Sequence, residues 1–249
     1  MKFDDELEIK NVMVIYAHPD DAEFGCSGTC AKWAREGVEI TYCMVTNGAS
    51  GTRDKAMTRE KLAAIREKEQ RDAAELLGVK NVIFLGFEDG YLYPDLDLRK
   101  AVAREVRKVR PDVIISQDPT NRWWAPAYIN HPDHIAVGEV VLRTINPDAS
   151  SGLMFPELWH EEGLAPHKPL ALFLMTFQDP EVFVDITETI DLKIKALEAH
   201  ASQIGSWPVE EFIRERNKEI ANAAKKKKQP GPFEYAEAYK LFRLEPDED

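Results

Sequence analysis

Cysteine is scarce in this sequence, and its scarcity excludes one class of protein. Only three cysteines occur among the 249 residues, Cys26, Cys30 and Cys43, an odd number that does not suggest a disulfide framework. Cys26 and Cys30 are four positions apart at the start of a predicted helix. Because no second Cys/His pair has matching spacing, we interpret them as small buried apolar residues rather than a metal pair. This cysteine usage favours a reducing cytoplasm.

Long apolar runs and an excess of basic charge are also missing. No apolar run approaches the roughly 20 residues that a membrane span needs. The first ten residues, MKFDDELEIK, are acidic and polar, unlike a secretory signal. A formal net charge of −12 argues against a general nucleic-acid binder, which would present a basic face. The basic run Lys225–Lys228 is expected to be a solvated loop. We therefore expect a cytoplasmic protein that uses neither nucleic acid nor membrane as a partner.

The first 145 residues alternate between strand and helix patterns. Short runs of apolar and β-branched residues predict strands, and stretches with apolar residues three or four apart predict helices. The predicted strands are Val12–Ala17, Val38–Val45, Val82–Leu85 and Val113–Ser116, and the predicted helices begin near Phe24, Arg59, Leu96 and Ile135. This order predicts an α/β fold, a Rossmann-like three-layer sandwich with a mostly parallel central sheet.

The rest of the chain predicts two more strands and two more helices. The strands are Leu170–Thr176 and Val182–Asp185, and the helices run from about Glu188 to Gln203 and from Pro208 to Ala224. Thr187 is a candidate cap for the first of these helices. Since no linker or internal repeat divides the chain, we expect one domain over residues 1–249, with 205–249 as a helical or irregular C-terminal extension.

Two polar stretches follow predicted strands and concentrate the reactive side chains. Residues 17–21 read AHPDD and residues 131–134 read HPDH, so the candidates are His18, Asp20, Asp21, His131, Asp133 and His134. Two histidines and an aspartate from separate strand ends have the composition of a His₂Asp zinc site with a position left for water. Zinc would lower the pKa of that water towards ~7. A further carboxylate could then accept its proton, and a remaining imidazole could polarise a carbonyl or protonate a leaving amine.

These motifs resemble the LmbE/PIG-L family of zinc-dependent deacetylases. That family removes acetyl groups from N-acetylglucosaminyl compounds and includes the mycothiol, bacillithiol and chitobiose deacetylases. Outside the two motifs, the resemblance rests on Gly25, Gly28, Arg66, Glu69, Leu77-Gly78-Val79, Leu85-Gly86, Asp89-Gly90, Lys195, His200, Ser202 and Gln203. It extends to about residue 205. It also implies a homo-oligomer, a trimer or a hexamer.

The resemblance implies roles for three residues of the first motif and for the last residue of the second. His18, Asp21 and His134 would hold Zn²⁺. Sites of this composition also accept Fe²⁺ or Co²⁺. Asp20 would be the general base that activates the water.

Four further residues receive roles from the same resemblance. His131 would stabilise the oxyanion or act as general acid, and Asp133 would orient the His131 imidazole and hold its charge. Arg66 and Asp89 would bind substrate, because a guanidinium and a carboxylate suit sugar hydroxyls.

Four positions leave their roles open. Some family members have a tyrosine two residues before the first histidine of the second motif, and this chain has Ile129 there. Trp123 and Trp124 suit either a sugar-stacking platform or packing against the core or a subunit. His200 suits catalysis, helix packing or a subunit contact.

The sequence thus predicts a zinc-dependent amide hydrolase that removes the N-acetyl group from an N-acetylglucosamine-containing small molecule. One alternative is an amidase of thiol-sugar conjugates. Another is a non-catalytic sugar-binding α/β domain, against which Asp20 argues, since a structural zinc has no use for an unligated carboxylate. A phosphoesterase would need more carboxylate ligands and two metals.

Overall fold

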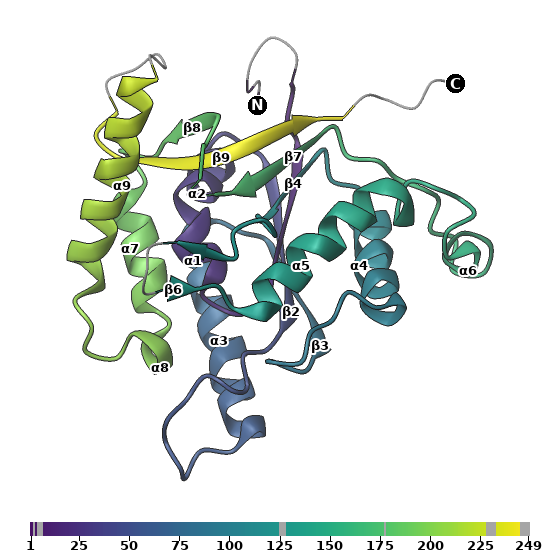
Figure 1. Ribbon diagram of the computed structural model, residues 1–249, viewed down its shortest axis with the longest axis horizontal. Coiled ribbons are helices and arrows are strands. Elements are labelled where there is room, and N and C mark those ends of the chain that lie inside the picture. Colours follow the sequence, from purple (N-terminus) through teal and green to yellow (C-terminus); the bar gives the residue numbers. More distant parts are fainter. Residues whose placement is uncertain (2, 4–6, 125–127, 177, 228–232, 245–249) are drawn as a thin grey trace.

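A mixed sheet forms the centre of the computed structural model, which describes residues 1, 3, 7–124, 128–176, 178–227 and 233–244 (Figure 1). Among these residues the sheet has seven strands in the order β3-β2-β1-β4-β7-β9-β8. The strands are β1 (Asn11–Tyr16), β2 (Glu39–Thr46), β3 (Asn81–Phe87), β4 (Val113–Gln117), β7 (Ala171–Met175), β8 (Val182–Asp185) and β9 (Ala236–Arg243). A separate two-stranded hairpin pairs β5 (Trp123–Trp124) with β6 (Tyr128–Ile129).

Helices cover both faces of the sheet. One layer contains α1 (Asp21–Gly25), α2 (Ser27–Arg35), α3 (Arg59–Leu77), α7 (Ile190–Glu198), α8 (Ala201–Ile204) and α9 (Val209–Lys226). The other contains α4 (Leu96–Val109), α5 (Pro132–Arg143), η1 (Thr144–Asp148) and α6 (Pro156–His160). Figure 1 shows the two layers on opposite sides of the strands. The predicted three-layer α/β architecture is confirmed. None of the helices within the described ranges has the length and apolar character needed to cross a membrane.

The central strand β1 contributes to the cores on both sides. Val12, Val14 and Tyr16 pack into the cluster beneath α2 and α7. Met13 and Ile15 pack into the cluster beneath α4 and α5. Since β1 is paired in parallel with β2 and β4 and is covered on both faces, its sequence is a continuous apolar run without polar alternation.

The C-terminal part departs from the predicted helical or irregular extension. Residues 236–243 form β9, which is antiparallel to β7 on one side and to β8 on the other. The pattern of apolar residues did not indicate this strand, because its second residue, Glu237, is an acid. The fold nevertheless buries Glu237, which is only 1% exposed. Contacts from distant parts of the chain compensate that charge, including an ion pair with Lys193. Residues 228–232 and 245–249, with Lys228 of the basic run, lie outside the described residues.

The helix predicted from about Glu188 to Gln203 is two helices. α7 begins at Ile190, with Thr189 in the N-cap position, and α8 begins after His200. Thr187 does not cap α7, because its hydroxyl donates to the Asp185 carboxylate (Oγ1–Oδ1 2.6 Å). The break places the His200 imidazole in the interior, fully buried.

Candidate active site and metal centre

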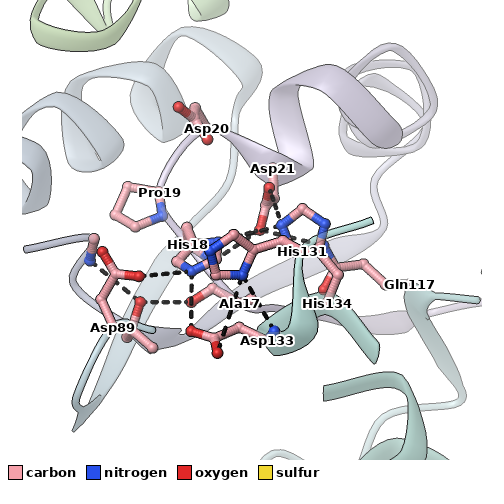
Figure 2. A network of polar contacts seen from close by, with 12 residues as sticks. Ala17, His18, Pro19, Asp20, Asp21, Asp89, Gln117, His131, Asp133 and His134 are labelled. Atoms are coloured by element: carbon pink, nitrogen blue, oxygen red, sulfur yellow. Dashed lines mark hydrogen bonds and ion pairs between the residues drawn. The ribbon is translucent and has the colours of Figure 1, made fainter. Parts of the chain in front are cut away.

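The predicted site residues converge at the carboxyl edge of the parallel strands. From β1 the chain continues to β2 on one side, and β4 later joins β1 on the other side, so the crevice between the ends of β1 and β4 is a topological switch point. His18 follows β1, Asp89 follows β3, and His134 lies in the first turn of α5. Figure 2 shows the His18 imidazole with Asp89 on one side and His134 on the other.

His18, Asp21 and His134 bring three potential ligand atoms together. His18 Nδ1 is 3.3 Å from His134 Nε2, and the Asp21 carboxylate is 3.4 Å from the first nitrogen and 3.1 Å from the second. Tetrahedral zinc with N and O ligands at ~2.0–2.1 Å places its ligand atoms about 3.3 Å apart. The three residues therefore fit a zinc ion in spacing and in donor type.

Hydrogen bonds on the far sides of the imidazoles orient both lone pairs toward this point. His134 Nδ1 lies 3.0 Å from the Asn130 amide oxygen, so it carries the proton and leaves Nε2 unprotonated. His18 Nε2 lies 3.0 Å from Asp89 Oδ1 and 3.2 Å from Asp133 Oδ2, which leaves Nδ1 as the acceptor. A metal cation between the two nitrogens would satisfy both of them, and outer hydrogen bonds of this kind are typical of metal-ligating histidines.

The local chain conformation fixes Asp21. Asp20 has a left-handed backbone (φ 90°), and Asp21 then begins α1. The turn lets the Asp21 carboxylate accept the His18 backbone N–H at 2.8 Å and the Gln117 side-chain amide at 3.2 Å. Although burial acts to raise the pKa of Asp21, the neighbouring imidazoles of His134 and His18 hold it well below its usual range.

The carboxylates of Asp89 and Asp133 flank the other side of His18. Asp133 accepts the backbone N–H groups of Gly90 (2.7 Å) and Leu92 (3.2 Å), and Asp89 accepts that of Ser50 (2.7 Å). Burial acts to raise the pKa of Asp89, but the hydrogen bond and charge of His18, the Ser50 N–H and the Arg66 charge lower it to about 2. His18, Asp89 and Asp133 are thus a second set of close potential ligands, beside the set of His18, His131 and His134.

Asp20 lies beside the proposed ligands and contacts Arg66. The Arg66 guanidinium donates to Asp20 Oδ2 (3.2 Å), to the Pro19 carbonyl (2.5 Å) and to the Gly48 carbonyl (2.9 Å). Burial raises the pKa of Asp20 to about 6, although Arg66 acts to lower it. Arg66 is itself buried, so the structure places the predicted substrate-binding guanidinium behind the predicted base.

His131 is the most exposed of the three imidazoles, with 41% of its side chain accessible. Its Nδ1 accepts the Asp133 backbone N–H at 3.2 Å, so the neutral ring carries its proton on Nε2. The Asp133 carboxylate is 4.0 Å from His131 Nδ1 and makes its shorter contacts with His18 and Gly90. In the structure, the backbone N–H of Asp133, and not its carboxylate, therefore orients the His131 ring.

Sequence reasoning missed the amides and the buried network that support these residues. Gln117 is the last residue of β4 and Asn130 directly precedes His131, but an amide carries no charge to mark it as part of a site. Gln70 accepts the Asp20 N–H at 3.1 Å and donates to Glu23 at 2.9 Å. His200 Nε2 lies 3.2 Å from the same Glu23 carboxylate, so this histidine belongs to the layer behind Asp20.

A cavity of about 700 Å³ opens next to the proposed ligands. Asp20, Asp21 and His134 line one end of it, and residues of α9 line another part. A volume of this size is typical of small-molecule sites. The arrangement combines a metal-competent triad, a neighbouring carboxylate and room for a substrate, which together suit hydrolysis of an amide or ester. The side chain of Trp124 lies outside the described residues.

Comparisons with known proteins agree with this chemistry. The family described as "PIG-L: GlcNAc-PI de-N-acetylase" matches residues 13–145. The diacetylchitobiose deacetylase of Thermococcus kodakarensis is 33% identical over 79% of this chain and 71% of its own length. A probable N-acetyl-alpha-D-glucosaminyl L-malate deacetylase of Bacillus anthracis is 32% identical over 83% and 86%.

A solved structure is similar over nearly the whole fold. The N,N'-diacetylchitobiose deacetylase from Pyrococcus horikoshii has a TM-score of 0.84 and 30% identity, covering 95% of this chain and 85% of that one. The likeness thus extends well beyond the segment of the family match.

Proposed function

This chain belongs to the PIG-L family, and we propose that it is a metal-dependent deacetylase that hydrolyses the N-acetyl group of an N-acetylglucosamine-containing small molecule. The observation that carries the proposal is the convergence of His18 Nδ1, Asp21 and His134 Nε2 within 3.1–3.4 Å, beside Asp20 and a cavity. The deacetylase names of its relatives support the reaction type.

Zinc is the metal that we propose for the site, held by His18, Asp21 and His134. The donor set of two imidazoles and one carboxylate, with both tautomers oriented, supports this choice. A bound zinc ion would polarise the substrate carbonyl and lower the pKa of water towards ~7. Fe²⁺ or Co²⁺ would also satisfy these donors.

Asp20 accepts the proton of the attacking water in this proposal. Its carboxylate lines the cavity next to the proposed ligands, and Arg66 fixes Oδ2 at 3.2 Å. A carboxylate whose pKa is raised to about 6 is a better proton acceptor than an ordinary aspartate and remains ionised at neutral pH.

His131 completes the reaction, and the Asp133 backbone N–H orients its ring. The His131 Nε2–H would donate to the oxyanion that develops from the acetyl carbonyl, or deliver a proton to the departing amine. The products are acetate and a free amino sugar. Substrate binding by Arg66 and Asp89 remains a prediction. In the structure, Arg66 contacts Asp20 and backbone carbonyls, and Asp89 contacts His18 and a backbone N–H group.

The cellular compartment and the oligomeric state of the protein are also proposals. Three free, buried cysteines support a reducing cytoplasm. Exposed apolar side chains on the β5–β6 hairpin, Trp123 (64%) and Ile129 (85%), support a trimer or hexamer in which this hairpin contacts another subunit.

The test is acetate release by metal-free protein before and after addition of zinc. The panel is N-acetylglucosamine, its disaccharide and an N-acetylglucosaminyl glycoside, with His134→Ala as the control that lacks a ligand. Zinc-dependent release by the wild type alone supports the proposal. If zinc-loaded wild-type protein releases no acetate but hydrolyses a larger acyl amide, the activity is that of an amidase; if it binds the sugars without hydrolysis, the protein is a sugar-binding domain.

A further inference from the structure

One short helix, α8, lies behind the site and carries three polar side chains toward it. The helix is a single turn that begins after His200 and lies next to α3 (Figure 1). His200, Ser202 and Gln203 contact three other segments of the chain. None of these three side chains, all within the described part of the chain, lines the cavity. An effect on the reaction would therefore pass through the segments that they contact.

Ser202 holds the turn of α3 that supports Asp20. Glu69 accepts the Ser202 backbone N–H and the Ser202 hydroxyl, each at 2.7 Å. The first N–H groups of a helix have no partner within the helix, so a carboxylate that accepts one of them joins the two helices firmly. Glu69 follows Arg66 by three residues and directly precedes Gln70. Arg66 donates to Asp20 Oδ2 at 3.2 Å, and Gln70 accepts the Asp20 N–H at 3.1 Å.

His200 holds Glu23, which lies one helical turn after Asp20. Its Nε2 is 3.2 Å from Glu23 Oε2, and both side chains are fully buried. The other Glu23 oxygen accepts the side-chain amide of Gln70 at 2.9 Å. Burial of a carboxylate costs free energy unless its oxygens are paired, and here His200 and Gln70 pair one oxygen each. Because the Gln70 NH₂ group faces Glu23, its oxygen faces the Asp20 N–H.

Gln203 holds the loop after β2 against Arg66. Its side-chain amide donates to the Gly51 carbonyl at 3.1 Å, and the Gly48 carbonyl of the same loop accepts Arg66 at 2.9 Å. A Cβ atom at Gly51 would lie 2.6 Å from Arg66 Nη1 and 3.0 Å from Gln203 Oε1, closer than van der Waals contact. The loop backbone therefore closes directly on the guanidinium that contacts Asp20.

We propose that the turn from His200 to Gln203 positions the proposed base, Asp20, through these three segments. Within the described residues its side chains contact groups that support Asp20, so His200, Ser202 and Gln203 are positioning residues. The inference rests on the proposed deacetylase function, and it gives His200 a role that its place in the sequence left open. Loss of these contacts should slow the reaction without weakening substrate binding, whereas loss of a purely structural contact should lower stability alone.

The first experiment compares Ser202→Ala with Ser202→Thr in zinc-loaded protein. Ser202 is exposed, so both variants should fold. We expect Ser202→Ala to lower kcat for acetate release about tenfold, the lower end of the range for outer partners of a metal site, with KM and zinc content little changed. Ser202→Thr keeps the hydroxyl and should retain the wild-type kcat, as should the control Ser206→Ala at another exposed serine. Wild-type kcat in Ser202→Ala would overturn the inference.

A double-mutant cycle shows whether the effect passes through Asp20. In the Asp20→Asn background no base remains to be positioned, so adding Ser202→Ala should change kcat by about twofold or less. The same tenfold loss in both backgrounds would contradict the inference. His200→Gln, which keeps a donor beside Glu23, and Gln203→Ala should behave alike: each should lower kcat when Asp20 is present and have little effect when it is absent.

Amide hydrogen exchange tests the positioning without any reaction. The Asp20 N–H is protected by its hydrogen bond to Gln70, and local loosening exposes it to exchange. In Ser202→Ala, exchange followed by NMR should be several-fold faster at Asp20 and unchanged in β1, and Ser206→Ala should match the wild type. Wild-type exchange at Asp20 in Ser202→Ala would overturn the inference. Absence of acetate release from zinc-loaded wild-type protein would instead refute the proposed function.

Discussion

Two groups of buried charged side chains in this molecule are built in opposite ways. The first consists of Lys193 and Glu237, which are 2.7 Å apart and almost completely buried. The remaining capacity of the Glu237 carboxylate is used by the Gly28 N–H (3.0 Å), the Thr29 N–H (2.8 Å) and the Tyr239 hydroxyl (3.0 Å). One negative charge meets one positive charge and three neutral donors, so this group is complete without a ligand.

The second group, around His18, has more acceptors than donors. Its imidazole faces the carboxylates of Asp21, Asp89 and Asp133, and its Nδ1 faces a second acceptor, His134 Nε2. A metal cation at the point between the ligand atoms would satisfy both nitrogens and offset part of the negative charge. Burial of charge alone therefore does not indicate function. Several acceptor atoms that face one common point do indicate a site for a ligand.

Loss of a ligand should have the largest effect, because it acts on the acceptor-rich group. His134→Ala and Asp21→Asn should abolish zinc-dependent acetate release. The loss of activity should exceed the roughly 10–100-fold loss that removal of an outer hydrogen-bond partner causes. Zinc content per chain should fall with activity in both variants. A variant with full zinc content and near wild-type activity would show that its residue is not a ligand.

Asp20→Asn should have the next largest effect, because it removes the proton acceptor and leaves the proposed ligands in place. We expect kcat to fall by about 10²–10⁴-fold, the usual contribution of general base catalysis, with zinc content unchanged. The measurement is kcat on the best substrate together with metal analysis. Turnover at the wild-type rate would contradict the role of Asp20.

Glu237→Ala should instead destabilise the fold, because it leaves the Lys193 ammonium buried without its partner. The free energy of unfolding should fall by about 3–5 kcal/mol, with zinc content retained in the folded protein. Urea titration measures this change. As a matched control, Asp191→Ala removes an exposed partner of Arg214 and should cost less than about 1 kcal/mol. Comparable losses in the two variants would contradict the assigned difference between the buried and exposed pairs.

Gln70→Leu should give the smallest effect, since Gln70 acts on the reaction only through Asp20. Its oxygen holds the Asp20 N–H at a left-handed turn, and its amide donates to Glu23. We expect kcat to fall about tenfold with KM little changed, within the range for outer partners of metal sites. Glu75→Gln on the exposed side of α3 is the control. Equal changes in KM and kcat would point to substrate binding rather than positioning.

Local signals made much of the fold predictable. The helices Arg59–Leu77 and Leu96–Val109 begin at the predicted residues because their N-caps are local: Thr58 and Asp95 accept backbone N–H groups of the first turn. Gly78 ends the first helix in a left-handed conformation. β9 could not be predicted in the same way, since its buried Glu237 is compensated by Lys193, 44 residues away.

The candidate site was predictable in its charged residues and not in its support. Histidine and aspartate stand out within AHPDD and HPDH, and the structure brings the three proposed ligands of these motifs within 3.4 Å of one another. The positions of Gln117 and Gln70 depend on contacts between segments that are far apart in sequence. Asn130 contacts His134, four residues later, and lacks a charge that would mark it as part of a site. The location of Arg66 behind Asp20 likewise required the fold.

The most direct test of this account is the position of a bound metal ion. A crystal structure of zinc-loaded protein, with anomalous scattering recorded at the zinc edge, identifies the ligand atoms. We predict one ion bound by His18 Nδ1, the Asp21 carboxylate and His134 Nε2, with Asp89 and Asp133 still contacting His18 Nε2. An ion between His18 Nε2, Asp89 and Asp133, or no ion in this crevice, would contradict the account.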